Sequence, residues 1–92
     1  MSSDLTPDER RVRALTHAAL ELEFAARAAE IERNRAVVEL LDSGGSTPTP
    51  LARAMKLDPS RVRQIRSQWP TTFAKWDKDR PQIEARIKAL DE

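Results

Sequence analysis

The segment from Pro59 to Gln68 carries the side chains with the most recognisable chemistry. A guanidinium such as that of Arg63 can donate two parallel hydrogen bonds to O6 and N7 of guanine, and a carboxamide such as that of Gln64 can bind N6 and N7 of adenine. If the segment is a helix with Val62 and Ile65 facing inward, its polar and basic residues share the opposite face. The side chains expected to contact base edges in DNA are Ser60, Arg61, Arg63, Gln64 and Ser67.

The net charge of the chain is only +1, and this average conceals a segregation of charge along the sequence. Residues 46–76 hold six basic side chains and one acidic side chain, Asp58, whereas residues 1–45 hold six basic and nine acidic ones. A surface that serves only solubility normally mixes both signs, so the absence of acidic residues from 59 to 76 favours a polyanionic partner such as double-stranded DNA. The residues expected to contact DNA phosphates are Thr47, Thr49, Arg53, Lys56, Arg66 and Lys75.

Less specific explanations stay open for several residues. Arginines on an amphipathic helix often form only a solvated face, and Glu/Arg pairs at helical spacing usually support a surface. A lone histidine, here His17, is more often structural than a ligand or a catalytic base. Aromatic residues at helical spacing more often belong to a core than to a binding surface, and here they are Trp69, Phe73 and Trp76.

Composition excludes several classes of protein. The chain has no Cys, which removes disulfide frameworks, thiolate zinc sites, iron–sulfur clusters and cysteine nucleophiles. Its two glycines, Gly44 and Gly45, are too few for a glycine-rich phosphate loop. No apolar run approaches the roughly 18 residues of a membrane span, and the polar start of the chain is unlike a signal peptide. We therefore expect a cytoplasmic, nucleoid-associated protein with no cofactor, metal, membrane partner or small-molecule substrate.

A short motif supports one enzymatic alternative. The run Phe24-Ala25-Ala26-Arg27 faintly resembles the first helix of small all-helical chorismate mutases, a family of similar length. That family needs a lysine further along the same helix, and the first lysine of this chain is Lys56. No other catalytic arrangement is visible, so we expect that the protein is not an enzyme.

The first half of the chain is predicted to form one long helix. Thr6-Pro7-Asp8-Glu9 is a capping box, neither Gly nor Pro occurs from Asp8 to Asp42, and Ser43-Gly44-Gly45 is a stop signal. About 35 helical residues span about 50 Å, which exceeds the width of about 30 Å of a compact domain of this size. The helix should therefore either break near Thr16-His17 or pack on a second chain.

A homodimer through this helix is the arrangement that we favour. One apolar stripe advances from Val12 to Ala29 in alternating steps of three and four residues, and a second stripe makes the apolar surface too wide for one neighbour to cover. The residues expected at the dimer interface are Val12, Leu15, Leu20, Leu22, Phe24 and Ile31.

A polar linker, residues 43–49, should lead into short helices. Thr49 is expected to cap the first of them and Pro50 to open it, with a break at Lys56-Leu57-Asp58. Asp58 and Pro59 should then start a second helix that ends at Trp69-Pro70.

A short element around residues 72–77 and a last helix from about residue 79 should complete the chain. No segment alternates with period two, so the predicted fold is all-α: a long N-terminal helix, two helices joined by a turn, and one or two short C-terminal helices. We expect a dimerisation segment at residues 1–45 and a DNA-binding domain at residues 46–92.

The run Leu51–Gln68 resembles the helix-turn-helix of bacterial DNA-binding proteins, including small phage and plasmid repressors, and residues 60–65 are similar to the recognition helix of sigma-factor region 4. Where that family typically has Gly in the turn, this chain has Lys56, which must adopt a left-handed conformation at some cost in energy. The resemblance implies that residues 59–68 form a recognition helix in the major groove. The positions that the family keeps apolar or small are occupied by Leu51, Ala52, Met55, Leu57, Val62 and Ile65.

These features predict a sequence-specific, homodimeric, DNA-binding transcriptional regulator, most simply a repressor that occludes a promoter. Its two recognition helices would meet successive major grooves, about 34 Å apart, on an inverted repeat. Twelve Arg against four Lys favours a bacterial source. The alternatives are an architectural, nucleoid-associated DNA-binding protein and a helical protein–protein interaction module that does not bind DNA.

Overall fold

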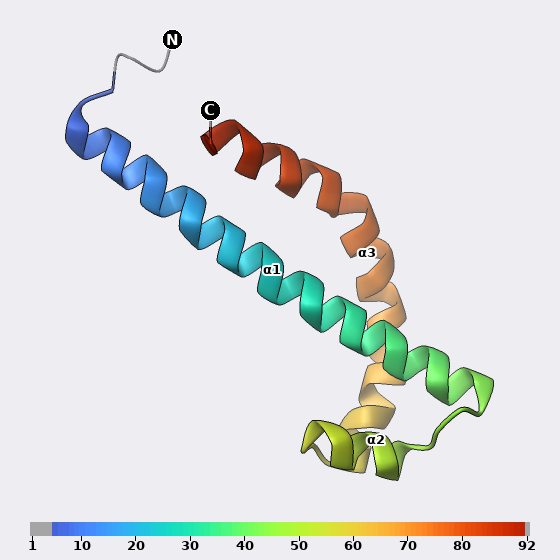
Figure 1. Cartoon of the computed structure of the whole chain (residues 1–92). Coiled ribbons are helices and arrows are strands. Elements are labelled where there is room, and N and C mark those ends of the chain that lie inside the picture. Colours follow the sequence, from blue (N-terminus) through green and yellow to red (C-terminus); the bar gives the residue numbers. More distant parts are fainter. Residues whose placement is uncertain (1–4, 92) are drawn as a thin grey trace.

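Three helices make up the computed structural model, which describes residues 5–91. They are α1 (Pro7–Ser43), α2 (Pro48–Met55) and α3 (Pro59–Asp91), shown in Figure 1. Residues 5–91 contain no strand, so the predicted all-α class is confirmed for this part of the chain. None of the three helices combines the length and the apolarity that crossing a membrane requires.

Local signals define both ends of α1. The Thr6 hydroxyl accepts a hydrogen bond from the backbone N–H of Glu9 at 3.1 Å, as expected of an N-cap. Gly44 ends the helix in the left-handed region at φ 76° and donates its N–H to the Leu41 carbonyl at 3.4 Å. Of the two alternatives for the long helix, the break near Thr16-His17 does not occur: α1 runs through 37 residues without interruption, because neither Gly nor Pro occurs between Asp8 and Asp42.

The start of α2 lies two residues before the predicted one. Thr47, and not Thr49, is the N-cap residue, with extended backbone at φ −125° and ψ 166° but no hydrogen bond from its side chain. The reason is that Pro48 already suits the first helical position, where its missing N–H leaves no partner unsatisfied.

The turn between α2 and α3 contains the three predicted residues, Lys56 to Asp58. Lys56 adopts the left-handed conformation at φ 56° and ψ 45°, and among residues 5–91 it is the one non-glycine residue with positive φ. The Leu57 N–H then donates to the Ala52 carbonyl at 2.9 Å, which closes the end of α2. The predicted break and its left-handed residue are confirmed.

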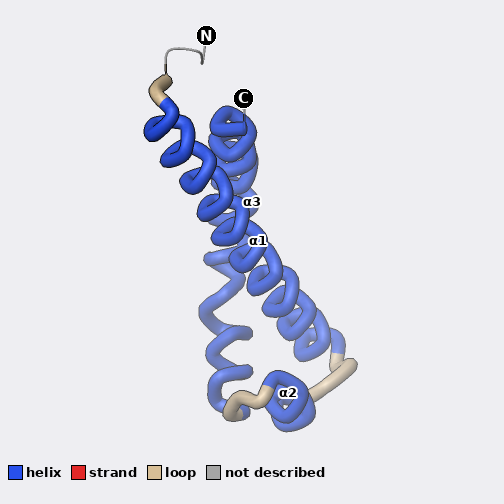
Figure 2. Tube along the Cα trace, turned by 60° about the vertical axis from the view of Figure 1, so that its left-hand side comes forward, coloured by secondary structure: helices blue, strands red, loops and turns tan. Residues whose placement is uncertain are grey.

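The prediction for the rest of the chain was wrong. Instead of ending at Trp69-Pro70 and restarting twice, α3 is one helix of 33 residues with Pro70 and Pro81 inside it. A proline within a helix costs about 3 kcal/mol through a lost hydrogen bond and a clash. Packing against α1 stabilises the continuous helix: Trp76 is buried, and its ring centre lies 5.3 Å from that of Phe24. Figures 1 and 2 show α3 bending along its course, as helices do at proline.

The C-terminal part of α3 runs back along the N-terminal part of α1 (Figure 1). The Arg13 guanidinium fastens the two ends by donating to the carbonyls of Leu90 at 3.1 Å and Ala89 at 2.9 Å, which the last turn of a helix leaves unpaired. The molecule is elongated, 57 × 25 × 17 Å with a radius of gyration of 18.3 Å, and α1 is longer than a compact domain of this size is wide, as its length predicted. One side of the long helix is covered by its own chain.

All three helices contribute to the core. Val37 of α1, Ala52 of α2, and Val62 and Ile65 of α3 are buried together, as the sequence pattern indicated for the last three. The core therefore crosses the predicted boundary between residues 45 and 46. Leu57, which was expected at an apolar position of the turn, is 36% exposed. Half-buried apolar side chains surround the core, namely Val38, Leu41, Leu51, Met55 and Trp69.

Candidate nucleic-acid interface

The first turns of α3 divide cleanly into a buried and an exposed face. Val62 and Ile65 are 0% and 5% exposed and hold this part of α3 against α1 and α2. The Asp58 carbonyl accepts hydrogen bonds from the N–H groups of Arg61 at 2.9 Å and Val62 at 3.4 Å, which fixes the start of the helix. The five predicted base-contacting residues are all exposed: Ser60, Arg61, Arg63, Gln64 and Ser67. Two of them, Arg61 and Gln64, also border the contact with α1.

Four of the six predicted phosphate-binding residues are exposed on the elements just before α3. Thr47 and Thr49 are exposed at the start of α2, Arg53 is exposed in its last turns, and Lys56 is exposed in the turn that leads to α3. α2 and the turn before α3 therefore carry exposed hydroxyl and cationic side chains. Their arrangement can bind the backbone of a nucleic acid without reading its sequence.

Lys75 does not belong to this group. It lies fifteen residues after Ser60 on the same helix, or about 22 Å along the axis. Its neighbours around a shallow hollow include Arg27 of α1 and Thr72 of α3, not the side chains near the turn.

An ion pair that sequence reasoning missed engages Arg66. Its Nε atom lies 2.9 Å from Oδ1 of Asp42, at the end of α1, and both side chains are 56% exposed. The two residues are 24 positions apart in the sequence, so helical spacing could not predict this ion pair. Asp42 therefore competes with any phosphate for this guanidinium.

A small polar cavity lies behind the exposed face. It has a volume of about 120 Å³ and is bordered by Asn34 of α1 and by Arg61, Gln64 and Gln68 of α3. Asn34 is fully buried, its Oδ1 accepts from Nε of Arg33 at 3.0 Å, and its Nδ2 has no hydrogen-bond partner. The cavity places an unpaired amide next to two of the predicted base-contacting residues. Sequence reasoning missed this cavity, because Asn34 lies between two arginines and no local pattern marks it as buried.

Cations from α1 cover the aromatic side chains of α3. The guanidinium carbon of Arg27 lies 5.4 Å from the ring centre of Trp69, and that of Arg35 lies 5.1 Å from that of Phe73. Arg35 also donates to Asp77 at 2.6 Å, and this hydrogen bond raises the pKa of the Arg35 guanidinium above its ordinary value. The aromatic side chains Trp69, Phe73 and Trp76 are thus part of the contact between α1 and α3. This agrees with the interpretation that they belong to the core and not to a binding surface.

The long helix carries the six predicted dimer residues on two different sides. Ile31 is 2% exposed, Phe24 packs on Trp76 and Leu20 is half-buried, so these three face α3 of their own chain. The other three face solvent, with exposed fractions of 63% for Val12, 59% for Leu15 and 73% for Leu22.

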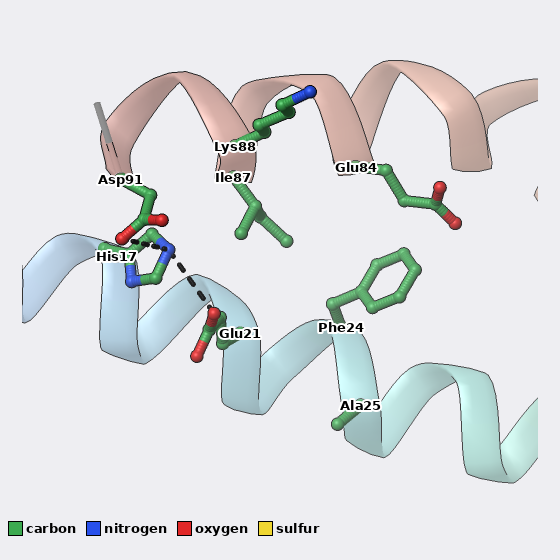
Figure 3. A pocket seen from close by; sticks show the side chains of 8 residues that line it. All are labelled: His17, Glu21, Phe24, Ala25, Glu84, Ile87, Lys88 and Asp91. Carbon is green, nitrogen blue, oxygen red and sulfur yellow. Dashed lines mark ion pairs between the residues drawn. The ribbon is translucent and has the colours of Figure 1, made fainter.

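A hollow of about 500 Å³ lies where the end of α3 meets α1 (Figure 3). His17 points toward the end of α3, with Nε2 at 3.3 Å from Glu21 and 3.9 Å from Asp91. The contact with Glu21 lies within α1 and that with Asp91 reaches α3, which fits a structural role for the histidine. Within residues 5–91, no three His or acidic side chains are arranged to hold a metal ion.

The geometry is therefore that of two helices joined by a tight turn, with a shared core on one side and, on the other, an exposed face of α3 that has no acidic residue from position 59 to position 76. No similarity to another protein adds to this description. Comparisons with profiles of known protein families, with curated proteins and with solved structures find no match to this chain.

Proposed function

We propose that α2, the turn and the first turns of α3 form a helix-turn-helix that binds double-stranded DNA in a sequence-specific way. The observation that supports this most strongly is the exposed face of α3, which carries Arg61, Arg63 and Gln64 and has no acidic residue from position 59 to position 76. In the major groove, Arg63 would donate to O6 and N7 of guanine and Gln64 would bind the edge of adenine. Val62 and Ile65 would hold the helix in place from behind.

Phosphate contacts would supply most of the affinity, and the salt dependence of binding reports their number. Each phosphate neutralised contributes about −0.9 to the slope of log K against log salt on duplex DNA. The exposed positions of Arg53 and Lys56 suit this role, whereas Arg66 must first leave Asp42. Lys75 is too distant along α3 to share the same stretch of backbone, so we assign it no contact with that stretch.

We further propose that the protein acts as a homodimer through α1 and regulates transcription, most simply as a repressor that occludes a promoter. The exposed side chains of Val12, Leu15 and Leu22 support self-association, because contiguous apolar surface of this kind is seldom left open on a monomer. Two copies would present two recognition helices to two half-sites.

Selection of bound fragments from a pool of random duplexes, carried out at low and at moderate salt, tests the proposal. Sequence-specific binding predicts enrichment of one motif that persists at the higher salt. Retention at low salt without enrichment would instead favour an architectural DNA-binding protein. Absence of binding at both salts, together with no retention on heparin, would favour an interaction module and would refute the proposal.

A further inference from the structure

The exposed side of α1 has the repeat of a coiled-coil seam. Six residues at alternating steps of three and four are all exposed, and they lie opposite the side that meets α3 through Phe24 and Ile31. Branched and small side chains both occur in the seam, in the order Val12, Leu15, Ala19, Leu22, Ala26 and Ala29.

We propose that this seam pairs with the same seam of a second copy in antiparallel orientation, about a twofold axis between residues 20 and 21. The orientation rests on the proposed dimerisation through α1 but not on DNA binding. It places the two copies of Val37, which packs on the start of α3, about 50 Å apart along α1, so the half-sites would be further apart than the roughly 34 Å of successive major grooves. In this register every branched side chain meets an alanine. Val12 packs on the partner's Ala29, Leu15 on the partner's Ala26, and Leu22 on the partner's Ala19. Pairing of large with small residues at each layer lets the helices approach closely without voids.

Charges at the ends of the seam fit the same register. Asp8 continues the seam by one step of four residues and faces the partner's Arg33, whose Nε also donates to Asn34 of its own chain. Arg11 faces the partner's Glu32. One pair of like charges meets in this register, because Glu9 lies next to the partner's Glu30. Within one chain, Glu30 is already paired with Arg27 at 2.6 Å, which reduces this repulsion.

Other arrangements fit less well. A parallel pair stacks alanine on alanine at positions 19, 26 and 29 and brings two copies of Arg33 together in the seam. Shifting the antiparallel pair by one heptad toward the end of α1 places Leu15 opposite the partner's Arg33. Shifting it by one heptad the other way leaves Ala26 opposite the partner's Asp8, with fewer apolar layers. The geometry therefore points to a single register.

Disulfide formation between single-cysteine variants tests the register, because the natural chain has no Cys. Leu15→Cys and Ala26→Cys are mixed in a glutathione buffer. The antiparallel register predicts a mixed disulfide, and neither variant alone should cross-link, since two copies of residue 15 lie about 16 Å apart along the axis. Ala14→Cys, which is exposed but outside the seam, replaces Leu15→Cys as the matched control and should stay reduced.

Molar mass measured by light scattering completes the test. The natural chain should have the mass of a dimer, and Leu22→Glu should halve it while leaving the helical signal unchanged, because Leu22 is 73% exposed in the single chain. A monomeric natural chain would overturn self-association. Homodisulfides of the Leu15→Cys variant would overturn the orientation, and a dimer without the mixed disulfide would overturn the register. A mixed disulfide in a chain that does not bind DNA would refute the proposed function alone.

Discussion

Replacement of Lys56 by glycine should make the protein more stable while it weakens DNA binding. Lys56 ends α2 at φ 56° and ψ 45°, a left-handed conformation that an L side chain adopts at a cost of about 1–2 kcal/mol. Glycine adopts it freely but loses about 0.5–1 kcal/mol more chain entropy on folding. The net expectation for Lys56→Gly is stabilisation by about 0.5–1 kcal/mol, which would raise the melting temperature by about 2–8 °C for a chain of this size.

Thermal unfolding followed by circular dichroism measures this change. Ala54→Gly, two residues earlier in the helical part of α2, is the matched control, because glycine in a helix costs up to about 1 kcal/mol relative to alanine. The control should melt at a lower temperature than the natural protein. If Lys56→Gly is destabilised as much as Ala54→Gly, the left-handed turn at residue 56 is refuted.

The effect of Lys56→Gly on stability can be distinguished from its effect on DNA binding. Lys56 is exposed and is proposed to contact a phosphate, so its loss should weaken binding to all DNA sequences and reduce the salt slope by about one. Lys56→Ala keeps the backbone cost and removes the same charge, so it should bind DNA as weakly as Lys56→Gly without gaining stability.

Three further predictions concern the core and the contacts behind the interface. Val62→Ala removes methyl groups from a fully buried site, so chemical denaturation should show a loss of about 1–3 kcal/mol; a loss below 0.5 kcal/mol would contradict its place in the core. Asn34→Leu removes a buried amide whose Nδ2 is unpaired, so the same assay should show unchanged or higher stability, and a large loss would reveal a partner for that amide. Asp42→Ala should release Arg66, changing stability by less than about 1 kcal/mol while steepening the salt slope of DNA binding; an unchanged slope would show that Arg66 does not reach a phosphate.

Features encoded by a few adjacent residues could be predicted from the sequence. The cap at Thr6, the left-handed stop at Gly44 and the break at Lys56 each depend on the backbone of one or two residues. The inward positions of Val62 and Ile65 follow from helical periodicity alone. These local rules were sufficient to separate the exposed from the buried side of the candidate interface.

Features that depend on distant contacts could not be predicted in this way. Pro70 and Pro81 are local signals against a helix, and packing of α3 on α1 overrides both. The contact of Arg13 with the last carbonyls of α3 spans more than 75 positions, and it explains how the end of a long helix is covered without a second chain. The two alternatives drawn from the sequence, a break near Thr16 and a second chain, did not include this contact.

The candidate interface shows the same division. Exposure of Arg63 and Gln64 followed from the helical pattern, whereas the pairing of Arg66 with Asp42 depends on how the end of α1 meets α3. The distance of Lys75 from the other cations depends on α3 continuing through Pro70, which the sequence argued against. Charge segregation along the sequence thus indicates that a basic surface exists. Which of the basic side chains lie together on that surface depends on the path of the helices.

Affinity measured on the selected duplex and on a random duplex of the same length tests the central claim most directly. Arg63→Ala should lose about 1–3 kcal/mol, or about 5- to 150-fold, on the selected duplex and little on the random one. Arg86→Ala, an exposed arginine 23 residues further along α3, is the matched control and should bind both duplexes as the natural protein does. Equal losses for Arg63→Ala on both duplexes, or no loss on either, would contradict sequence reading by this face of α3.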